Sequence, residues 1–456
     1  MFSNLKRPNS FFRSVVTLTS GTAIAQSIAI IASPVITRMY SPDNMGMLAS
    51  YNAIISILGV IATGCYDQAI VLPEDEDDAN AVAFLGVGIA IVFGLVITMV
   101  FLFWGTPLSY ILKLQEIPRG WLYCIGFAVA LMGIDAILNK LIIRHRRFKI
   151  LAFTQITQQL SVNGIKIGSA LLGMGSKGLY AATIFGHLIR EAQLFLFQGN
   201  RFLKDKKMPD FYKMKEMAKR YKKFPLVAAW SVMLNSASTQ VPVIVITSVF
   251  SATVTGYYSL SHRILSLPMI FIGQSVAQAF IDRAARARKC PDELAKITLA
   301  IYKKLLLIGS VSMSVITFYG DILFPFVFGA KWAIAGKYAQ WLSLWLVFVL
   351  SASPLSSIYA ILERQGEGLI INIIMFVSRI GIIIIARLMG FSDINMIIAF
   401  SILGAILWNG TSFRILRLVH ISVGEILKTN LFTVGIVFMF QFIGSIFLRR
   451  LLWQLR

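Results

Sequence analysis

Apolar runs long enough to cross a lipid bilayer recur along almost the whole of this 456-residue sequence. A membrane-spanning helix needs roughly 20 mostly apolar residues. The chain is 57% hydrophobic and 14% charged, which is more apolar surface than a water-soluble core of this length can bury. The sequence therefore predicts an all-α polytopic membrane protein.

The predicted spans form two sets of six, followed by one more apolar run. The first set covers residues 15–37, 46–72, 82–104, 119–143, 150–173 and 177–198, and the second covers 225–250, 254–281, 298–320, 337–361, 368–389 and 393–413. We expect four regions: an N-terminal six-helix bundle (1–198), a basic cytoplasmic linker (199–224), a C-terminal six-helix bundle (225–413) and a C-terminal extension (414–456). Whether the extension adds a membrane helix at 431–448 is left open, because a thirteenth span moves the basic residues after it to the outer side.

The basic residues are distributed unevenly between the two sides of the predicted membrane protein. The chain carries 43 Lys and Arg against 21 Asp and Glu, a balance that in a soluble protein suggests nucleic acid as a partner. Here most of the basic residues fall in loops on one side, which is cytoplasmic if the N-terminus lies there. This is the positive-inside pattern, so the charge indicates orientation and no nucleic-acid partner is expected.

One pattern occurs twice, 210 positions apart. The stretch "ITRMYSPDNMG" (36–46) returns as "ITSVFSATVTG" (246–256), and six of 22 positions are identical when 36–57 is aligned with 246–267. A duplication of six helices gives two parallel repeats related by an axis along the membrane normal, with a substrate site between them. The alternative is a chance likeness between two apolar segments that share a turn. Only the first copy carries an arginine, Arg38, so we expect the halves to differ in their charges.

Polar residues follow one face of several predicted spans. In the fifth span Gln155, Gln159, Asn163 and Lys166 recur at helical spacing, so one face of that helix avoids lipid. Similar stripes occur in the first, seventh, eighth and eleventh spans: Thr22, Gln26 and Ser33; Ser231, Asn235 and Ser238; Ser259, Arg263 and Ser266; and Asn372 and Arg379. Because both sets of helices contribute, the pattern predicts a shared central cavity that holds water.

Basic side chains outnumber acidic ones at membrane depth. A charge at a helix centre costs about 2.5–3.5 kcal/mol on insertion scales, so such residues face a wet interior or a partner. The candidate substrate-binding residues are the cations and the polar stripe of the fifth span: Arg38, Lys140, Lys166, Arg263, Arg379, Gln155, Gln159 and Asn163. A cationic cavity implies an anionic substrate, and the planar guanidinium group suits phosphate. The alternative for each cation is snorkelling to a headgroup or pairing with a carboxylate.

Two carboxylates at membrane depth are candidates for ion coupling. Asp67 lies in "CYDQAIVLP", and Asp135 is followed one helical turn later by Asn139. A carboxylate at this depth can bind a coupling cation or a proton. A salt bridge to a cation of the cavity explains both residues equally well. The three cysteines of the chain show neither pairing nor metal-ligand spacing, so no disulfide, metal site or cofactor is expected.

The linker between the two predicted bundles is the longest polar stretch of the chain. After residue 209 it places Phe211, Met214, Ala218 and Tyr221 at helical spacing among lysines. This pattern is typical of an amphipathic helix that lies on anionic lipid. A helix that is merely solvated fits the sequence about as well.

Three of these stretches resemble the recurrent pattern of a known family: "SPVITRMYSPDNMG" (33–46), "GCYDQAIVLPEDEDDA" (64–79) and "GYYSLSHRILSLPMIFIGQSVAQAFI" (256–281). The family is the polysaccharide-transport branch of the multidrug, oligosaccharidyl-lipid and polysaccharide exporter superfamily, the Wzx-like repeat-unit flippases. The likeness extends over nearly the whole chain. At the position of Asp67 the family more often carries glutamate, a departure that keeps the charge.

The resemblance implies a fold and a substrate class. It implies two bundles of six helices that work by alternating access in the bacterial inner membrane. The implied activity is transfer of an undecaprenyl-diphosphate-linked oligosaccharide, for O-antigen, capsule or exopolysaccharide, from the cytoplasmic to the periplasmic leaflet. The implied partners are the lipid-linked oligosaccharide, anionic membrane lipids and, as a candidate, a glycan polymerase of the same pathway.

Two other functions compete with this interpretation. A drug/cation antiporter of the same superfamily shares the architecture, but its cationic substrates favour an acidic cavity. A membrane glycan polymerase or ligase needs a reaction site, and the predicted outer loops, such as 105–118 and 321–336, are short. No nucleophile motif, paired carboxylates or phosphate-binding glycine loop is present, so we expect a transporter and not an enzyme.

Overall fold

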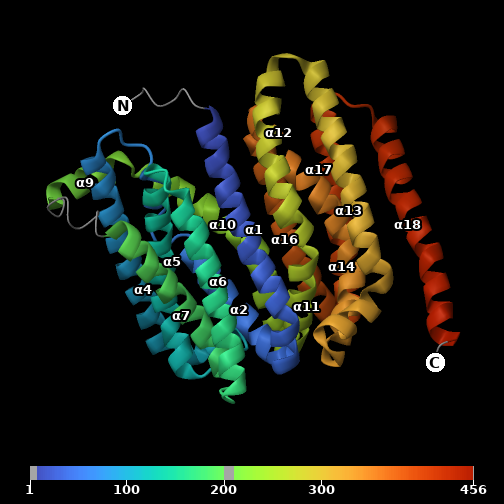
Figure 1. Cartoon of the computed structure of the whole chain (residues 1–456), viewed down its shortest axis with the longest axis horizontal. Coiled ribbons are helices and arrows are strands. Elements are labelled where there is room, and N and C mark those ends of the chain that lie inside the picture. Colours follow the sequence, from blue (N-terminus) through green and yellow to red (C-terminus); the bar gives the residue numbers. More distant parts are fainter. Residues whose placement is uncertain (1–7, 200–209, 455–456) are drawn as a thin grey trace. The chain divides into compact units, whose positions relative to one another are not determined.

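The computed structural model describes residues 8–199 and 210–454, and within these ranges every regular element is a helix (Figure 1). The helices form two compact units, Met1–Ser248 and Val249–Arg456. Nine helices of the described residues are long and apolar enough to cross a bilayer, or ten if one bent pair counts as a span. The predicted class, an all-α membrane protein, is confirmed, while the number of twelve spans stays a prediction.

The first unit consists of long helices joined by short turns. They are α1 (Pro8–Met39), α2 (Pro42–Gly59), α3 (Tyr66–Ala69), α4 (Glu76–Ile111), α5 (Arg119–Arg144), α6 (Phe148–Leu171), α7 (Ser176–Leu194), η1 (Phe195–Gly199), α9 (Phe211–Arg220), η2 (Phe224–Ala228) and α10 (Ala229–Val249). In this unit α4 packs on α5, and α6 packs on both α1 and α7.

The second unit has the same character. Its helices are α11 (Ala252–Leu265), η3 (Met269–Gly273), α12 (Gln274–Arg286), η4 (Ala287–Lys289), α13 (Pro291–Phe328), η5 (Ala330–Trp332), α14 (Ala333–Ala352), η6 (Ser353–Leu355), α15 (Ile358–Ile361), α16 (Gln365–Leu388), α17 (Asp393–Leu418) and α18 (Val423–Gln454). Here α14 packs on α11, α13 and α17, and α18 packs on α13. The span left open in the sequence is thus a helix, and its residues Val423–Ile446 are apolar enough to cross a membrane.

The outward faces of the long helices are apolar. Phe103 of α4 is 75% exposed, and Leu388 of α16 is 81% exposed. Rows of such side chains are unfavourable in water but match the hydrocarbon core of a bilayer. The surface therefore supports the membrane assignment independently of helix length.

The second predicted span (46–72) is not one helix, which corrects the sequence interpretation. α2 ends at Gly59, and the chain turns before α3 begins at Tyr66. Gly64 and Cys65 both adopt a left-handed backbone with φ of 59°. A left-handed residue cannot continue a right-handed helix, so the apolar run is divided there.

The 210-residue offset relates this break to one in the second unit. There α11 ends at Leu265, the π-helical turn η3 follows, and the two segments of the span meet at 41°. The helix starts also agree. The backbone N–H of Asn44 donates to Ser41 Oγ, and that of Val254 donates to Ser251 Oγ, each at 3.2 Å. The same serine cap therefore starts the second helix in both halves.

Each unit also has a close contact between glycines of two neighbouring long helices, in which Gly126 and Gly336 keep the 210-residue offset but their facing glycines do not. Gly126 of α5 lies against Gly94 of α4, and Gly336 of α14 lies against Gly320 of α13. A Cβ atom at Gly126 or at Gly336 would collide with the carbonyl oxygen of the facing glycine. Small residues allow membrane helices to approach this closely. Breaks, caps and glycine contacts together support the predicted internal repeat.

The sequence suggested that the linker helix lies on lipid or in solvent. In the structure the linker helix α9 packs on the first unit. Met217 is buried, and Met214 and Tyr221 pack beside it against a core of side chains from α3, α4 and α5. Phe211 and Tyr212 remain 75% exposed. The apolar stripe is therefore divided between the protein and the surroundings. The linker residues 200–209 lie outside the described part of the chain.

Acidic residues at the start of α4 form ion pairs with basic residues of α9. Asp78, in the first turn of α4, pairs with Lys213 at 3.0 Å and with Arg220 at 3.5 Å. The hydrogen bond and the charge of Asp78 raise the pKa of Lys213. Nearby, Arg144 of α5 pairs with Glu76 at 3.4 Å. The two pairs of Asp78 hold the linker helix at the end of the first unit where α4 begins, and the pair of Arg144 joins α5 to the same end.

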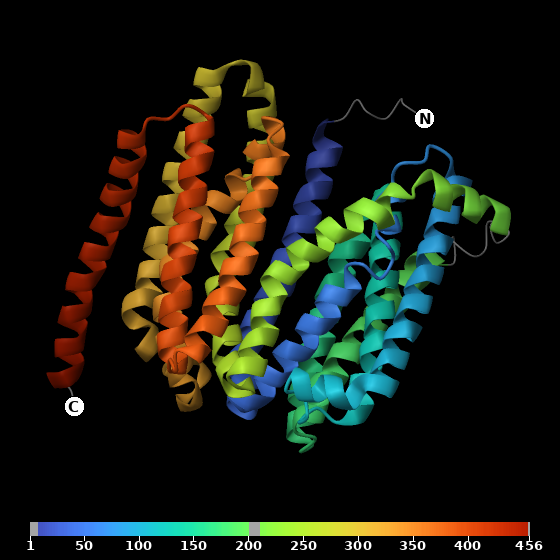
Figure 2. The ribbon, with the colours of Figure 1, turned by 180° about the vertical axis from the view of Figure 1, so that it is seen from behind.

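Helix α10 belongs to the first unit by its contacts. The hydroxyl oxygens of Ser50 in α2 and Thr247 in α10 lie 2.5 Å apart, and Ser236 donates to the Ser56 carbonyl at 3.4 Å. Figure 2 shows the two helices side by side. The sequence places 225–250 in the C-terminal bundle, so the observed division falls one helix later than the predicted one. The region boundaries drawn from the sequence stay a prediction.

Candidate functional site

A polar network crosses the interior of the first unit. Arg190 of α7 places its Nε 3.3 Å from Asp135 Oδ1 and donates from Nη2 to Asn139 Oδ1 at 3.1 Å. Asn139 in turn donates to Asp135 Oδ2 at 2.7 Å. The side chains of the pair are 12% and 18% exposed. Asp135, predicted for ion coupling, is therefore held in a nearly buried salt bridge, which was the alternative interpretation.

The next residue on α7 carries a carboxylate that this network does not satisfy. Glu191 is 7% exposed, and no hydrogen bond within the described chain reaches either of its carboxylate oxygens. Arg190, beside it, directs Nη1 to Gln158 Oε1 at 3.3 Å. An ionised carboxylate buried in this way is unfavourable unless a proton or a cation compensates it. Asp135 and Glu191 are thus two carboxyl groups near the single arginine Arg190.

One residue of the polar stripe of α6 contacts α1. Gln155 accepts a hydrogen bond from Thr22 Oγ1 at 2.8 Å. Asn163 is buried and donates to the Gln159 carbonyl oxygen at 2.7 Å. The carbonyl of Lys166 accepts from Tyr40 at 2.8 Å, while the Lys166 side chain is half-buried. Gln155 and Asn163 thus take part in helix packing.

The remaining candidates of the first unit lie apart from this seam. Asp67, in the short helix α3, accepts from Thr63 Oγ1 at 2.7 Å. Lys140 is half-buried on α5, next to Asn139 of the polar network. Arg38 is exposed in the last turn of α1. The structure therefore brings Asp135 into the polar network but does not gather all the predicted residues at one point.

In the second unit a cation lies against an aromatic ring. The guanidinium carbon of Arg379, on α16, lies 4.8 Å from the ring centroid of Trp345. Trp345 packs edge to face on Phe400 at 5.6 Å, and His262 stacks on Tyr258 at 5.7 Å. A cation over an indole face is stabilised by the ring quadrupole. Arg379 is thus held beside an aromatic cluster.

Arg263 lies one residue beyond His262, just before the break in its span. It is exposed, and no hydrogen bond or ion pair joins its side chain to another residue in the described ranges. Ser266 follows as the C-cap of α11, and η3 begins at Met269. Discontinuous helices of this kind form substrate sites in many transporters. Arg263 is therefore a candidate with donors available for an anion.

A family comparison covers most of the chain. Residues 35–336 match the model of a family described as polysaccharide biosynthesis protein. The chain belongs to this family. The match includes both copies of the repeated segment and ends within α14. A comparison with curated proteins finds no match.

Solved structures with the same fold are membrane transporters. The lipid II flippase MurJ in an inward closed conformation superposes with a TM-score of 0.71 at 16% identity, covering 93% of this chain and 96% of its own. A multidrug resistance MATE family transporter of the MOP superfamily, facing inward, gives 0.67 at 15% identity, covering 87% and 94%. A MOP superfamily transporter from Pyrococcus furiosus, for which reverse polarity of the binding pocket suggests a different function, gives 0.60 at 14% identity, covering 90% and 96%. The family member therefore has the fold of a membrane flippase or transporter, and the predicted resemblance is confirmed.

Several residues of these sites were not among those selected from the sequence. Arg190 and Glu191 are adjacent near the end of a predicted span, but nothing in the sequence shows that they meet Asp135. In the sequence, Trp345 has no polar neighbour at helical spacing, so nothing distinguishes it from an aromatic residue of an ordinary hydrophobic core. Its position under Arg379 follows only from the tertiary structure, in which α14 and α16 both pack on α17.

Proposed function

We propose that this protein is a flippase for lipid-linked oligosaccharides. It moves undecaprenyl-diphosphate-linked repeat units of O-antigen, capsule or exopolysaccharide from the cytoplasmic to the periplasmic leaflet of the bacterial inner membrane by alternating access. The observation that carries the proposal is the exposed Arg263, which has no partner in the described chain and lies at the break of its span. A guanidinium group in that position offers paired donors to a diphosphate.

Two further findings support a lipid-linked anionic substrate. The family to which the chain belongs acts in polysaccharide biosynthesis, by its description. The similar MurJ structure is that of a lipid II flippase, and lipid II is itself lipid-linked. In the proposal Lys166, Lys140, Arg38 and Arg379 are further cations that bind the substrate, and Gln155, Gln159 and Asn163 are polar residues that bind it.

We assign ion coupling in the proposal to the polar network of the first unit. Asp135 is bound to Arg190, and Glu191 has no hydrogen-bond donor among the described residues. A proton or small cation that binds Glu191 changes the charge of the network, and this change favours one arrangement of its helices over another. Asp67, which accepts from Thr63, is the second candidate for this role.

A drug/cation antiporter is the second candidate function, and Glu191 is the observation that favours it. A cationic drug would be attracted to a buried carboxylate that lacks a partner. Arg190, next to it, opposes such binding. A deletion strain with unchanged drug susceptibility argues against the antiporter.

The deciding experiment measures where the lipid-linked oligosaccharide accumulates. In a strain without the protein we expect it to build up in the inner leaflet, and the wild-type gene should restore its transfer. The same strain complemented with Arg263→Ala should still accumulate it, although the protein inserts at normal abundance. Normal transfer in the deletion strain contradicts the proposal.

The direction of transport depends on orientation, which cysteine labelling tests separately. Cysteines substituted at Lys177 and Lys337 should react with an impermeant reagent in intact cells. Cysteines at Lys149 and Lys213, and the native Cys290, should react only after the membrane is opened. Labelling at 149 and 213 in intact cells would reverse the proposed orientation.

A further inference from the structure

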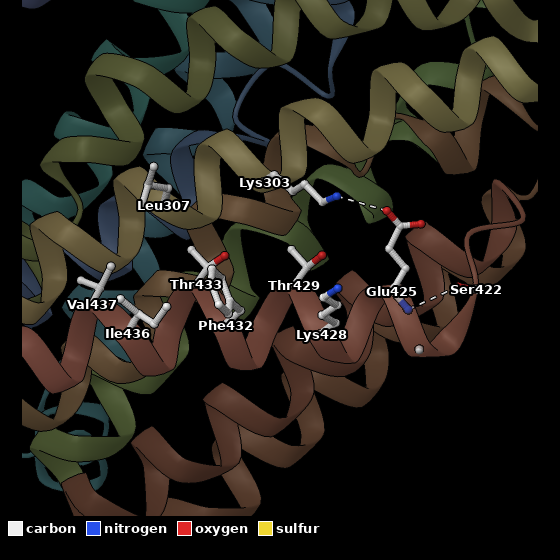
Figure 3. Close-up of a pocket in the computed structure, with 11 residues that line it drawn as sticks. Lys303, Leu307, Ser422, Glu425, Lys428, Thr429, Phe432, Thr433, Ile436 and Val437 are labelled. Carbon is white, nitrogen blue, oxygen red and sulfur yellow. Dashed lines mark hydrogen bonds and ion pairs between the residues drawn. The ribbon is translucent and has the colours of Figure 1, made fainter.

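A cavity lies between α13 and α18 of the second unit and takes no part in the sites described above (Figure 3). Its volume is about 870 Å³, within the roughly 300–1,000 Å³ of most ligand pockets. Figure 3 shows most of its side chains on α18, with Lys303 and Leu307 on α13 and Ser422 just before α18 begins.

The lining changes from charged to apolar along the helices. Ser422, Lys303, Glu425 and Lys428 lie at the end where α18 begins. Further along are Leu307 on α13 and Phe432, Ile436 and Val437 on α18. At 1.5 Å per residue, the stretch from Lys428 to Val437 extends about 13 Å. The cavity therefore has a polar head and an apolar body.

The polar head carries a net positive charge. Lys303 Nζ is 3.1 Å from Glu425 Oε1, so these two charges compensate each other. Lys428 is exposed, and within the described chain no hydrogen bond or ion pair holds its ammonium group. Its charge is available to an anion, and Lys303 can share its remaining donors with the same group.

The apolar body opens to the side of the protein that faces lipid. Phe432 lines the cavity and is nevertheless 67% exposed, and Leu431 beside it is 79% exposed. A cavity open to a bilayer along an apolar wall fills with hydrocarbon chains and not with water. Basic pockets between membrane helices on the cytoplasmic side bind anionic lipid headgroups.

Helix α18 is held on the second unit by contacts at two levels along the helix. Asn430 accepts a hydrogen bond from Tyr302 at 2.7 Å and donates to Asn409 of α17 at 3.0 Å. Phe318 of α13 meets Phe438 and Phe442 of α18 at about 6 Å. These contacts attach α18 to α13 and α17 near Asn430 and to α13 near Phe438 and Phe442. They do not fill the cavity.

We propose that the cavity binds one anionic phospholipid of the membrane. Its phosphate lies between Lys303 and Lys428, and one acyl chain follows Leu307, Ile436 and Val437. The bound lipid fills the space between α13 and α18 and holds α18 on the second unit. This site is separate from the proposed transport substrate and does not depend on it.

The test counts phospholipids retained by the full-length protein in native mass spectrometry after delipidation and exposure to equal amounts of phosphatidylglycerol and phosphatidylethanolamine. The wild type should retain one phosphatidylglycerol molecule in preference to phosphatidylethanolamine. The double variant Lys303→Ala/Lys428→Ala should lower that preference about 10-fold. Lys304→Ala is the matched control, because Lys304 is exposed on the same helix and does not line the cavity. An equal loss of the preference for phosphatidylglycerol in the double variant and in the Lys304→Ala control would contradict the proposed site.

A second pair of variants tests the apolar body without touching the charges. Ile436→Trp should fill the cavity and reduce lipid retention, whereas Met439→Trp, at an exposed position of α18 outside the lining, should not. A thermal melt confirms that each variant is folded. Undecaprenyl phosphate that displaces phosphatidylglycerol at equal concentration would overturn the assignment to a phospholipid. Competition by inorganic phosphate alone would overturn the role of the acyl chain.

Discussion

The two units share helix breaks, caps and glycine contacts, but they treat their interior charges differently. In the first unit Arg190 is paired with Asp135 and Asn139. In the second unit Arg379 lies over Trp345, and Arg263 has no partner among the described residues. A charge bound to a carboxylate is neutralised, whereas a charge against an aromatic face or open space keeps its attraction for an anion. The comparison indicates that duplication kept the scaffold and that the charges diverged.

The largest effect should come from breaking the ion pair of the first unit. Arg190→Ala leaves Asp135 nearly buried without its cation, which typically costs about 3–5 kcal/mol. We expect a lower melting temperature in detergent and lower abundance in the membrane. The double variant Arg190→Leu/Asp135→Leu should recover much of the stability, because it leaves no unpaired charge. A single variant as stable as the wild type would show that the pair is not structural.

Removing the cation of the second unit should affect transport and not stability. A hydrogen bond to a charged group contributes about 1.5–3 kcal/mol, so Arg263→Ala should reduce transfer about 10- to 100-fold. Arg263→Lys should restore it in part, since lysine keeps the charge but loses the planar pair of donors. Transfer is measured as lipid-linked oligosaccharide in each leaflet, with melting temperature as the control. If Arg263→Ala unfolds the protein as Arg190→Ala does, the two units do not differ in the way we infer.

Arg379 offers an intermediate case. Its contact with Trp345 is worth about 0.5–2 kcal/mol by analogy with other cation–π pairs. Arg379→Leu should therefore destabilise less than Arg190→Ala, because a cation–π contact is worth less than a nearly buried ion pair. The shift in melting temperature checks this order. A loss equal to that of Arg190→Ala would indicate that Arg379 also has an acidic partner.

The smallest effect concerns a pair of carboxyl groups in the first unit. A hydrogen bond with Asp43, followed by burial, raises the pKa of Glu116 above its ordinary 4.5. The folded state therefore binds this proton more tightly than the unfolded state, and stability should fall as the pH rises through the raised pKa. Glu116→Gln should flatten that part of the melting-temperature profile. The 210-residue offset places Thr253 and Phe326, which carry no carboxyl groups, at the equivalent positions of the second unit.

Much of the fold follows from local patterns in the sequence. Long apolar runs predict helices at α4, α5, α13 and α16, because a helix in a membrane must satisfy its own backbone hydrogen bonds. The ends of α5 and α16 agree with the prediction within three residues, whereas α4 and α13 extend six to eight residues beyond it at each end. The serine caps at Ser41 and Ser251 follow from the turn residues beside them. The break in the second span was missed, because its left-handed residues lie within an otherwise continuous apolar run.

Which polar residues meet was decided by the tertiary structure alone. The sequence placed Asp135 and Arg263 at membrane depth, but whether each is paired depends on the helix that packs against it. Arg190 reaches Asp135 because α7 packs on α5. No acidic side chain is paired with Arg263 within the described ranges. Helical periodicity determines the face on which a side chain lies, while its partner comes from a helix distant in sequence, and the sequence pattern of one helix does not contain that information.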